Sequence, residues 1–429
     1  MPDYEVIVVG AGLAGSTAAY CLAKEGFKVL LLERGDSAGS KNVTGGRLYA
    51  HSLEKIMPGF AGRAPVERRV TRETISLMTS ASSVNIDFQH PDGEAGPGSR
   101  SYTVLRATFD AWLAGEAEAA GCDFVCPAHV DRLHKEQGRI AGVVAGDDTL
   151  TADVVILADG INSLLAQQEG LKKELSPRHV AVGCKEMIEL TEEAINDRFN
   201  VPSAEGVARL FAGAPSEGLM GGGFLYTNKT TLSLGLVVTL DGLARGGTRL
   251  PDMLETFKQH PAVAPLIRGG RVVEYSAHLV PEGGIKTVPE LTADHLLVVG
   301  DAANLCLNLG YTIRGMDYAI ASGERAAQTL VEARQNGADY SRAGLAGYRR
   351  RLEQGSVLQD MNTYRNAPAF LERPGFYSTY PGLMENLLAD LYRVTGEPAV
   401  LARRKAWPRI RKAGVAGILA DVLKGTNAV

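Results

Sequence analysis

The stretch YEVIVVGAGLAGSTAAYCLAKEGFKVLLLERG, residues 4–35, decides the fold class. An apolar strand leads to Gly10, Gly12 and Gly15, an alanine-rich helix follows, and a second apolar strand ends at Glu33. Gly10 permits a tight turn, Gly12 lets a ligand approach the backbone, and Gly15 lets the helix pack closely on the sheet. Strand, turn, helix and strand in this order predict the first unit of a Rossmann-like α/β domain.

The same stretch predicts a dinucleotide-binding site. The first turn of the helix, around Leu13 and Ala14, directs free N–H groups and the positive end of the helix dipole at phosphate groups. Glu33 ends the second strand, where its carboxylate can accept hydrogen bonds from a ribose diol. Such an acid suits an unphosphorylated adenosine ribose and disfavours NADP. The motif alone does not separate FAD from NAD.

Size and composition limit the class of protein. The chain has 429 residues, 45% hydrophobic and 22% charged, so we expect two or three structural units. Its 49 acidic and 45 basic residues give a net charge of −4, which does not indicate a nucleic-acid partner. The chain opens directly with a strand and has no run of about 18 apolar residues. We therefore expect a cytoplasmic protein, with peripheral attachment to the inner face of the cell membrane left open.

The cysteine pattern indicates no metal site and no iron–sulfur cluster. The five cysteines are scattered, without a CxxC pair, and the eight histidines show no HxH or HxxxH spacing. A cluster needs several thiolates at close spacing, which this chain does not supply.

In each of three later segments, a predicted strand ends next to a charged residue, Arg106, Asp159 or Asp301. The segments are YTVLRATFDAWLAG at 102–115, LTADVVILADGINS at 150–163 and VVGDAANLCLNLGYTIRGMDYAIASG at 298–323. On the residues alone, Asp159 suits a helix cap as well as a binding site. The third segment fits a second nucleotide site, a metal loop on Asp301 or the far end of one ligand. The metal loop lacks ligands, because no cluster of His, Cys or carboxylate residues accompanies Asp301.

The order of these four segments resembles flavoproteins of the para-hydroxybenzoate hydroxylase and geranylgeranyl reductase group. The resemblance implies one FAD along the whole domain, with Val130 at the adenine and Asp159 and Gly160 near the nucleotide. It places Arg106 near the flavin or the phosphate–ribityl region and Asp301 at the ribityl hydroxyls. The helix that begins at Gly315 and Met316 would point its N-terminus at the flavin N1–C2 edge, where it stabilises negative charge.

Further segments resemble the electron-transfer flavoprotein–quinone oxidoreductase family, and most closely its FixC-type branch. They are GDSAGSKNVTGGRLY at 35–49, VGCKEMIEL at 182–190, GLMGGGFLYTNKTTLSLGLV at 218–237, FKQHPAVAPLIRGG at 257–270, EYSAHLVPEGG at 274–284 and IRGMDYAIASGERAA at 313–327. The resemblance spans residues 4–425. We name no catalytic residue, because electron transfer needs a positioned, tuned cofactor more than an acid or base. The FAD contacts that the resemblance implies are Gly10, Ala11, Gly12, Leu13, Ala14, Gly15, Glu33, Arg34, Lys41, Thr44, Gly45, Gly46, Arg106, Val130, Asp159, Gly160, Gly300, Asp301, Gly315 and Met316.

The resemblance also implies the fold and its division. We expect a Rossmann-like FAD-binding domain of the glutathione reductase-2 type, formed by residues 1–75, 101–170 and 290–340. An inserted, mainly antiparallel β-sheet domain takes residues 76–100 and 171–289, and a helical region takes 341–429. In the inserted domain, four residues either approach the flavin or a quinone-like acceptor or serve sheet packing: Lys185, Glu186, Tyr226 and Tyr275.

The C-terminal part of the sequence has two further patterns. The apolar stripe of the helix over PGLMENLLADLYRV, residues 381–394, is typical of a core-facing surface. The following RRKAWPRIRK, residues 403–412, surrounds Trp407 with basic side chains. That pattern fits contact with an anionic membrane or an acidic electron carrier as well as it fits a solvated tail helix.

The implied function is FAD-dependent oxidoreduction. Electrons would pass between a two-subunit electron-transfer flavoprotein of the FixAB type and either a separate ferredoxin-like iron–sulfur protein or a quinone at a membrane surface. The alternatives are a prenyl reductase like geranylgeranyl reductase, an NAD(P)H-dependent aromatic monooxygenase, and a flavin-bearing scaffold subunit. The loop after Asp301 counts against the monooxygenase, because it lacks the proline and the tight glycine spacing of that class.

Overall fold

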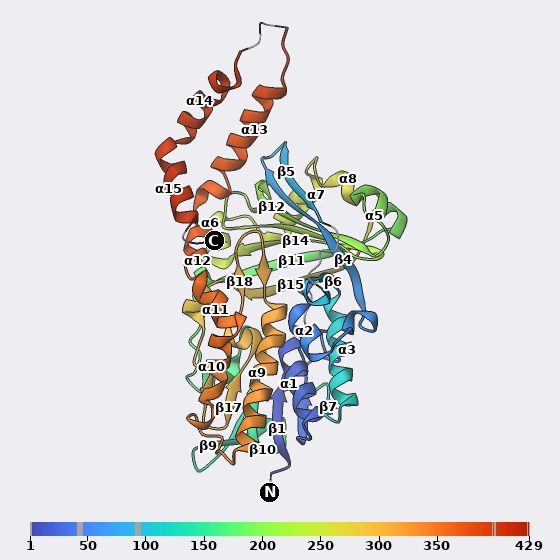
Figure 1. Cartoon of the computed structure of the whole chain (residues 1–429), viewed down its shortest axis with the longest axis vertical. Coiled ribbons are helices and arrows are strands. Elements are labelled where there is room, and N and C mark those ends of the chain that lie inside the picture. The colour runs from blue at the N-terminus through green and yellow to red at the C-terminus, as the bar shows by residue number, and fades with distance from the viewer. Residues whose placement is uncertain are drawn as a thin grey trace.

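The structure is a computed structural model that describes residues 2–40, 46–90, 96–396, 398, 400–426 and 428. It contains a mainly parallel sheet, a larger mainly antiparallel sheet across one end of it, and a helical extension beyond the second sheet (Figure 1). The predicted loop residues Lys41, Thr44 and Gly45 lie outside the described part of the chain.

The first sheet has a parallel centre. Its main strand order is β16 (Thr292–Ala293), β17 (Leu296–Val298), β10 (Asp148–Leu157), β1 (Tyr4–Val9), β2 (Val29–Leu32) and β7 (Asp123–Val125), and β8 (Arg132–Glu136) and β9 (Arg139–Ala145) join it through β10. β1 runs parallel to both β2 and β10, so the predicted β-α-β unit is confirmed. The strands β1, β2 and β17 are fully or mostly buried, which matches their continuous apolar sequences.

Helices cover this sheet. α1 (Leu13–Lys24) contacts both α3 (Arg106–Ala119) and α9 (Met316–Gln335). α1 and α9 pack at their backbones, because a Cβ atom on Gly323 would lie 2.2 Å from the carbonyl oxygen of Ala14 and 3.1 Å from the amide nitrogen of Ala18. Only glycine at position 323 permits this approach. The result is that both helices begin on the same side of the sheet.

The second sheet is mostly antiparallel. Its order is β15 (Arg271–Pro281), β11 (Val180–Glu189), β14 (Thr231–Thr239), β13 (Gly221–Thr227), β12 (Glu205–Gly213), β4 (Val66–Met78), β6 (Ser101–Val104) and β3 (Gly46–Tyr49), with β5 (Ser83–Gln89) paired to β4. One face packs on α7 (Leu250–Gln259) and forms a separate hydrophobic core. The predicted domain boundaries stay predictions, but β3, β4 and β6 pair within this sheet and not within the first.

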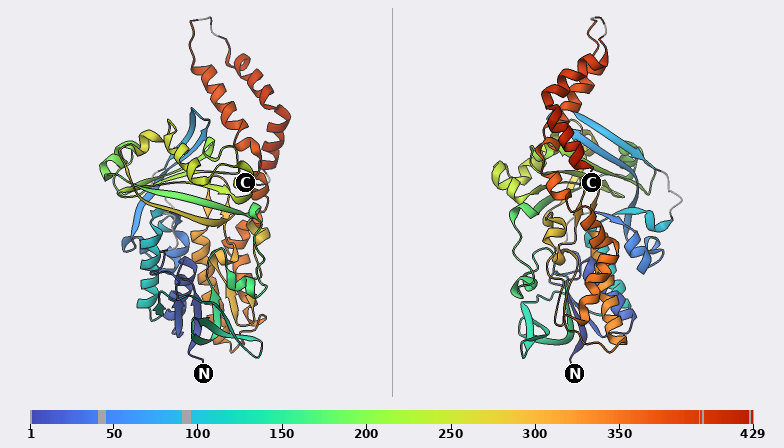
Figure 2. Two further views of the ribbon diagram at one scale, coloured as in Figure 1. Left: turned by 180° about the vertical axis from the view of Figure 1, so that it is seen from behind. Right: turned by 60° about the vertical axis from the view of Figure 1, so that its left-hand side comes forward.

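The remaining elements are short, or lie in the C-terminal part. They are α2 (His51–Ile56), α4 (Leu164–Gln168), α5 (Glu192–Phe199), α6 (Leu240–Gly246), α8 (Ala264–Ile267), β18 (Leu307–Asn308), β19 (Ile313–Arg314), α10 (Gly347–Gln354), α11 (Ser356–Thr363), α12 (Ala367–Leu371), α13 (Thr379–Tyr392), α14 (Ala402–Ala413) and α15 (Val415–Gly425). Figure 2 shows that α13, α14 and α15 project beyond the second sheet, at the end opposite the N-terminus.

The interpretation of the α13 stripe as a core-facing surface is wrong. Only Pro381 of this helix is buried, because α13 packs against α14 and the β4–β5 hairpin of the second sheet and contributes to neither hydrophobic core. Within the described ranges, no helix combines the length and apolar character that crossing a membrane requires.

The contact between α1 and α9 gives a stability prediction. Replacing Gly323 with Ala forces the two backbones apart, and such overpacking costs about 1–3 kcal/mol, more than the roughly 1 kcal/mol that alanine gains over glycine in a helix. We expect chemical denaturation to show a lower free energy of unfolding. Gly115 is the matched control, because it also lies in a helix but has no atom within 4 Å of its added Cβ. Gly115→Ala should stabilise the protein; equal effects of both changes would contradict the assigned contact.

Candidate functional site

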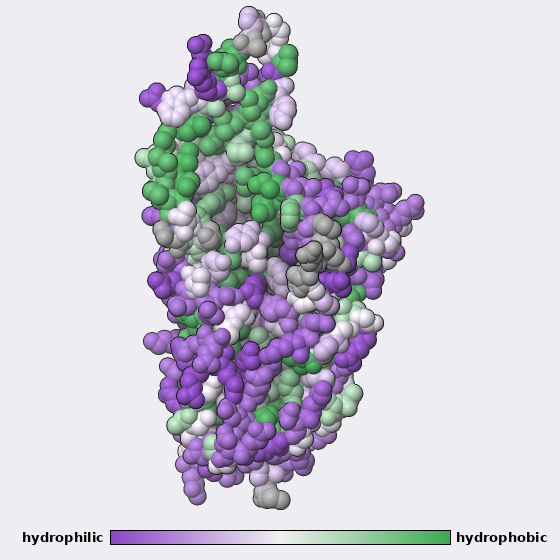
Figure 3. Space-filling view, in the orientation of Figure 1, coloured by the Kyte–Doolittle hydropathy of each residue, from purple (hydrophilic) through white to green (hydrophobic). Residues whose placement is uncertain are grey.

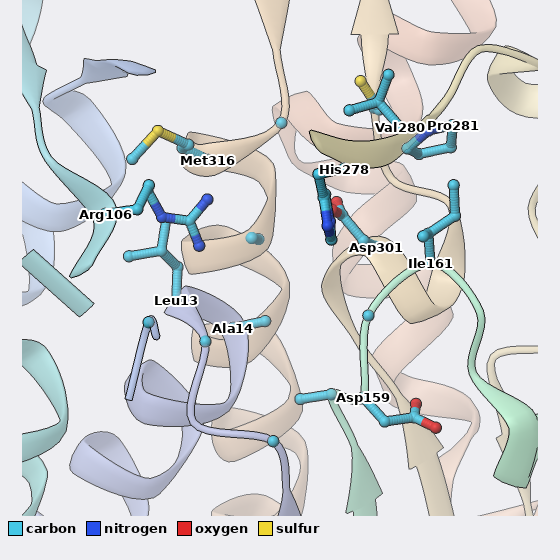
Figure 4. Close-up of a pocket in the computed structure, with 18 of the residues that line it drawn as sticks. Leu13, Ala14, Arg106, Asp159, Ile161, His278, Val280, Pro281, Asp301 and Met316 are labelled. Atoms are coloured by element: carbon cyan, nitrogen blue, oxygen red, sulfur yellow. The ribbon is translucent and has the colours of Figure 1, made fainter. Parts of the chain in front are cut away.

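A cavity of about 580 Å³ lies between the two sheets. The starts of α1 and α9, the ends of β2 and β10, and the inner face of the second sheet all contribute to its lining. Figure 4 shows Leu13 and Ala14 at the start of α1 facing the same space as Met316 and Asp301. The cavity therefore brings together segments that are about three hundred residues apart in the sequence.

The start of α1 has the geometry of a phosphate-binding turn. Gly10 has a φ of +104°, and a Cβ atom there would lie 2.4 Å from the carbonyl oxygen of Ala158. No side chain caps the helix at Gly12, so the N–H groups of the first turn remain available to a ligand. With the positive end of the helix dipole, this turn can hold an anionic group such as a pyrophosphate.

Glu33 is fixed next to this turn. Its carboxylate accepts hydrogen bonds from the Ala11 amide at 3.0 Å and the Gly35 amide at 2.7 Å. Arg34 and Val130 line the same end of the cavity. The backbone bonds hold the carboxylate at the rim in one orientation, where its remaining lone pairs can accept bonds from a diol.

Lys172 connects two loops of the cavity. Its Nζ donates to the carbonyl oxygens of Ile161 at 2.6 Å and Ala302 at 3.0 Å. Burial lowers the pKa of the Lys172 ammonium to about 8, and the charges of Asp159 and Asp301 oppose this shift. Burial raises the pKa of Asp159, whose carboxylate accepts a hydrogen bond from Ser163 at 2.7 Å. Sequence reasoning missed Lys172, which has no motif around it.

Asp301 lies at the centre of the cavity, beside a histidine from the other sheet. Figure 4 shows the His278 ring next to the Asp301 carboxylate, with Arg106 and Met316 across the space. Burial raises the pKa of Asp301, while the nearby His278, Arg106 and Lys172 lower it. Burial also lowers the pKa of His278. Sequence reasoning missed His278, although the two-residue period of β15 places it on the same face as Val280, which also lines the cavity.

Arg106 and α9 are each held by ion pairs. Arg106 donates to both carboxylate oxygens of buried Asp110, at 2.7 and 2.8 Å. No side chain caps α9 at Gly315, and Arg314 bonds Asp317 in the first turn at 2.8 Å and Asp360 at 2.6 Å. The N-terminus of α9 is thus fixed in place and directs its positive end at the cavity.

An aromatic wall closes the end of the cavity at the second sheet. Phe224 and Tyr226 stack with ring centroids 5.4 Å apart, and burial raises the pKa of Tyr226. Arg47 donates to Glu73 at 2.8 Å on the same wall. Leu210, Val237 and Ile313 also line this end.

The cavity contains most of the predicted contacts. Its lining includes Gly10, Gly12, Leu13, Ala14, Glu33, Arg34, Gly46, Arg106, Val130, Asp159, Gly160, Asp301, Gly315 and Met316. Ala11, Gly15 and Gly300 do not line it. The amide of Ala11 orients Glu33, and the two glycines permit close packing, because a Cβ on Gly15 would lie 1.9 Å from the Gly10 oxygen and one on Gly300 would lie 2.8 Å from the Ala14 Cβ.

Of the four residues expected near an acceptor in the inserted domain, Tyr226 lines the cavity and the others do not. Lys185 is 3% exposed and lies 3.6 Å from Glu274. Glu186 pairs with Lys258 at 2.9 Å, and Tyr275 is exposed on the edge strand β15. Among the described residues, no group of three or more His, Cys, Asp or Glu side chains could hold a metal ion.

Asp301 gives a binding prediction. Replacing Asp301 with Ala removes an acceptor at the middle of the cavity, so the purified protein should retain less FAD per chain, measured by its absorbance after gel filtration. Asp241→Ala is the matched control, because Asp241 lies in the first turn of α6 and does not line the cavity. Full FAD occupancy in both variants would show that Asp301 makes no contact with the cofactor.

Comparison with solved structures supports the fold. A geranylgeranyl bacteriochlorophyll reductase-like protein from Thermoplasma acidophilum is similar, with a TM-score of 0.73, 23% identity and coverage of 97% of this chain and 98% of that one. The flavin-dependent brominase Bmp2 gives a TM-score of 0.65 at 17% identity, covering 90% and 91%. At these identities the likeness shows the fold alone, and it confirms the predicted Rossmann-like class with mixed sheets.

Sequence comparison shows the family. Models described as an FAD binding domain and an FAD dependent oxidoreductase match residues 3–194 and 101–329, and the ETF-QO/FixC family C-terminal domain matches residues 367–429. The probable electron transfer flavoprotein-quinone oxidoreductase YdiS and the protein FixC, both of Escherichia coli (strain K12), are each 52% identical to this chain over 426 residues, covering 99% of both chains. The chain is therefore an FAD-dependent oxidoreductase and belongs to the electron transfer flavoprotein–quinone oxidoreductase/FixC family.

Proposed function

We propose that this chain transfers electrons between a two-subunit electron-transfer flavoprotein of the FixAB type and either a separate ferredoxin-like iron–sulfur protein or a quinone. The observation that carries the proposal is 52% identity across 99% of both chains to a relative described as a probable electron transfer flavoprotein-quinone oxidoreductase. Sequence identity over the full length is stronger support for a shared reaction than similarity of fold is.

In this proposal FAD lies along the cavity. Its pyrophosphate contacts the first turn of α1, its adenosine ribose contacts Glu33, and its adenine lies at Val130. Asp301 accepts hydrogen bonds from the ribityl hydroxyls. The flavin ring lies between the start of α9 and the aromatic wall. Two observations support this arrangement. No side chain caps α1 or α9, and Gly10 has a positive φ beside the Ala158 carbonyl, which glycine adopts without strain.

The residues of the chain then act by positioning and by charge. Bound FAD would supply the electron chemistry, which needs a positioned and tuned cofactor more than a catalytic acid or base. Arg106 and the N-terminus of α9 place positive charge beside the ring, and negative charge there is stabilised most strongly in a site that excludes water. Arg314 and Asp317 keep α9 in the orientation that this requires.

A cluster-bearing partner must be a separate polypeptide in this scheme. The five cysteines form no CxxC pair. The described part of the chain has no group of three or more His, Cys, Asp or Glu side chains that could hold a metal. A quinone is the other acceptor that the cavity suits, because the aromatic wall of Phe224 and Tyr226 offers a planar, apolar surface.

A reduction assay tests the proposed donor. Anaerobic stopped-flow mixing of the FAD-loaded chain with reduced electron-transfer flavoprotein should bleach its flavin absorbance rapidly, whereas NADPH should not. The reason is that the loop after Asp301 lacks the proline and the tight glycine spacing of the NAD(P)H-dependent monooxygenases. Gly10→Ala protein, which should bind no FAD, is the blank. Rapid NADPH oxidation stimulated by a phenol, or reduction of a prenyl double bond, would contradict the proposal.

We also propose that the C-terminal helices rest on an anionic membrane surface. Figure 3 shows a continuous hydrophobic area over α13 and α15. The exposed apolar side chains are Ile86 and Phe88 on β5 and Leu391, Tyr392, Val394, Trp407, Leu419, Val422 and Leu423. Tyr392 is 82% exposed and Leu423 is 67% exposed. Exposed basic side chains of α14, among them Arg403, Arg404 and Arg411, lie beside this area.

A vesicle-binding experiment tests this contact. Replacing Leu419 and Leu423 with Glu places charge on the apolar area, so flotation with vesicles of anionic phospholipid should fall at least about tenfold, since burying a leucine side chain gains about 1.5–3 kcal/mol. Tyr275→Glu is the control, because Tyr275 is also exposed but lies on β15. Replacing the three arginines with Gln should weaken binding mainly at low salt. Unchanged flotation of the leucine variant would contradict the proposed contact.

A further inference from the structure

We propose that Glu282 is a proton carrier coupled to the redox state of the cavity, taking up one proton for each pair of electrons that bound FAD receives. Glu282 directly follows β15, and its neighbour Pro281 lines the cavity. Cys306, whose thiol lies close enough to feel the charges of both Glu282 and Asp301, lines the cavity as well. The proposal rests on the proposed function only in placing FAD in this cavity.

The surroundings of Glu282 are polar but contain no cation among the described residues. The Nδ2 atom of Asn308 donates to both carboxylate oxygens, at 3.1 and 3.3 Å. The amide of Glu282 donates to the backbone oxygen of His179 at 2.9 Å. The other titratable groups that face Glu282 are the Cys306 thiol and the Tyr377 hydroxyl. None of these groups supplies a positive charge.

This distinguishes Glu282 from the carboxylates that line the cavity. Asp301 has His278, Arg106 and Lys172 nearby, and Asp159 has Lys172.

Two other carboxylates of the lining are also compensated. Glu73 is paired with Arg47, and Glu33 accepts bonds from two backbone amides. A cation or amide dipoles therefore compensate the charge of each of these carboxylates.

Glu282 can compensate its charge only by binding a proton. The side chain is 9% exposed, and an unpaired carboxylate in such a position favours its neutral form. Burial raises the pKa of Glu282 to about 7, with the Asn308 bond opposing the shift. The carboxyl group is therefore close to half-protonated near neutral pH, where a small change in local potential shifts its occupancy most.

The coupled step balances in charge and atoms. On reduction, bound FAD would accept two electrons and one proton, which would leave one more negative charge in the cavity. That charge raises the pKa of Glu282 further, so the carboxylate takes a second proton from solvent and becomes a carboxylic acid. Reoxidation by the acceptor lowers the pKa again and releases the proton. The electrons come from the donor flavoprotein, or from a chemical reductant in the test.

The pH dependence of the flavin midpoint potential follows from the raised pKa of Glu282. Below about pH 7 Glu282 already holds its proton in the oxidised protein, so reduction adds none to it. Above that pH, reduction draws an additional proton, and the midpoint potential of the flavin should fall more steeply as the pH rises.

Potentiometric titration of the FAD-loaded chain with small mediators, followed by flavin absorbance, tests this coupling. In the unaltered protein, the midpoint potential should fall more steeply with pH above about pH 7. This steeper dependence should be absent in Glu282→Gln and present in Glu282→Asp. Glu290→Gln is the matched control, because Glu290 is an exposed carboxylate paired with Arg342 and should keep the steeper dependence. If the midpoint potentials of the unaltered protein and of Glu282→Gln changed with pH in parallel, the proposal would be overturned.

A second measurement covers the case in which Glu282→Gln binds no FAD. Redox difference infrared spectroscopy of the unaltered protein at about pH 8, one unit above the Glu282 pKa, should show a carboxylic acid band that grows on reduction. Absence of that band would overturn the proposal. Both measurements use chemical reductants. Failure of the electron-transfer flavoprotein to reduce the chain would therefore contradict the proposed function without changing the outcome of either measurement.

Discussion

The backbone contact between α1 and α9 is the constraint on which the rest of the structure depends. Gly323 lets α9 lie against the Ala14 carbonyl, and the uncapped N-termini of both helices then open onto one cavity. One helix end can hold a pyrophosphate and the other can stabilise negative charge at a distant part of the same molecule. A single extended cofactor explains two such ends better than two separate ligands do.

Charge compensation is the second organising feature. The cavity collects several carboxylates, most of them partly buried, where an uncompensated charge is costly. Arg106, Lys172 and His278 surround Asp301, and Arg314 neutralises Asp317 at the start of α9. Glu282 is the carboxylate that lacks such a partner among the described residues, which is why a role in proton uptake is assigned to it and not to its neighbours.

Sequence predicted the parts of the site that depend on local geometry. The Gly10 turn, the acid at Glu33 and the strand end at Asp301 are each encoded within a few residues, so their positions follow from the local pattern. His278 reaches the cavity from the inserted sheet, whereas Lys172 and Glu282 adjoin residues that line it, and no local signal marks any of the three. The stripe on α13 was misread because the periodicity of a helix shows which residues share a face, but not what covers that face.

The most direct test of the account is an experimental structure of the FAD-loaded protein. We expect one FAD, with its pyrophosphate at the first turn of α1, its ribityl chain at Asp301 and the N1–C2 edge of its flavin at Met316. A flavin ring placed away from the start of α9, or a cofactor that contacts only the Gly10 turn, would contradict this expectation.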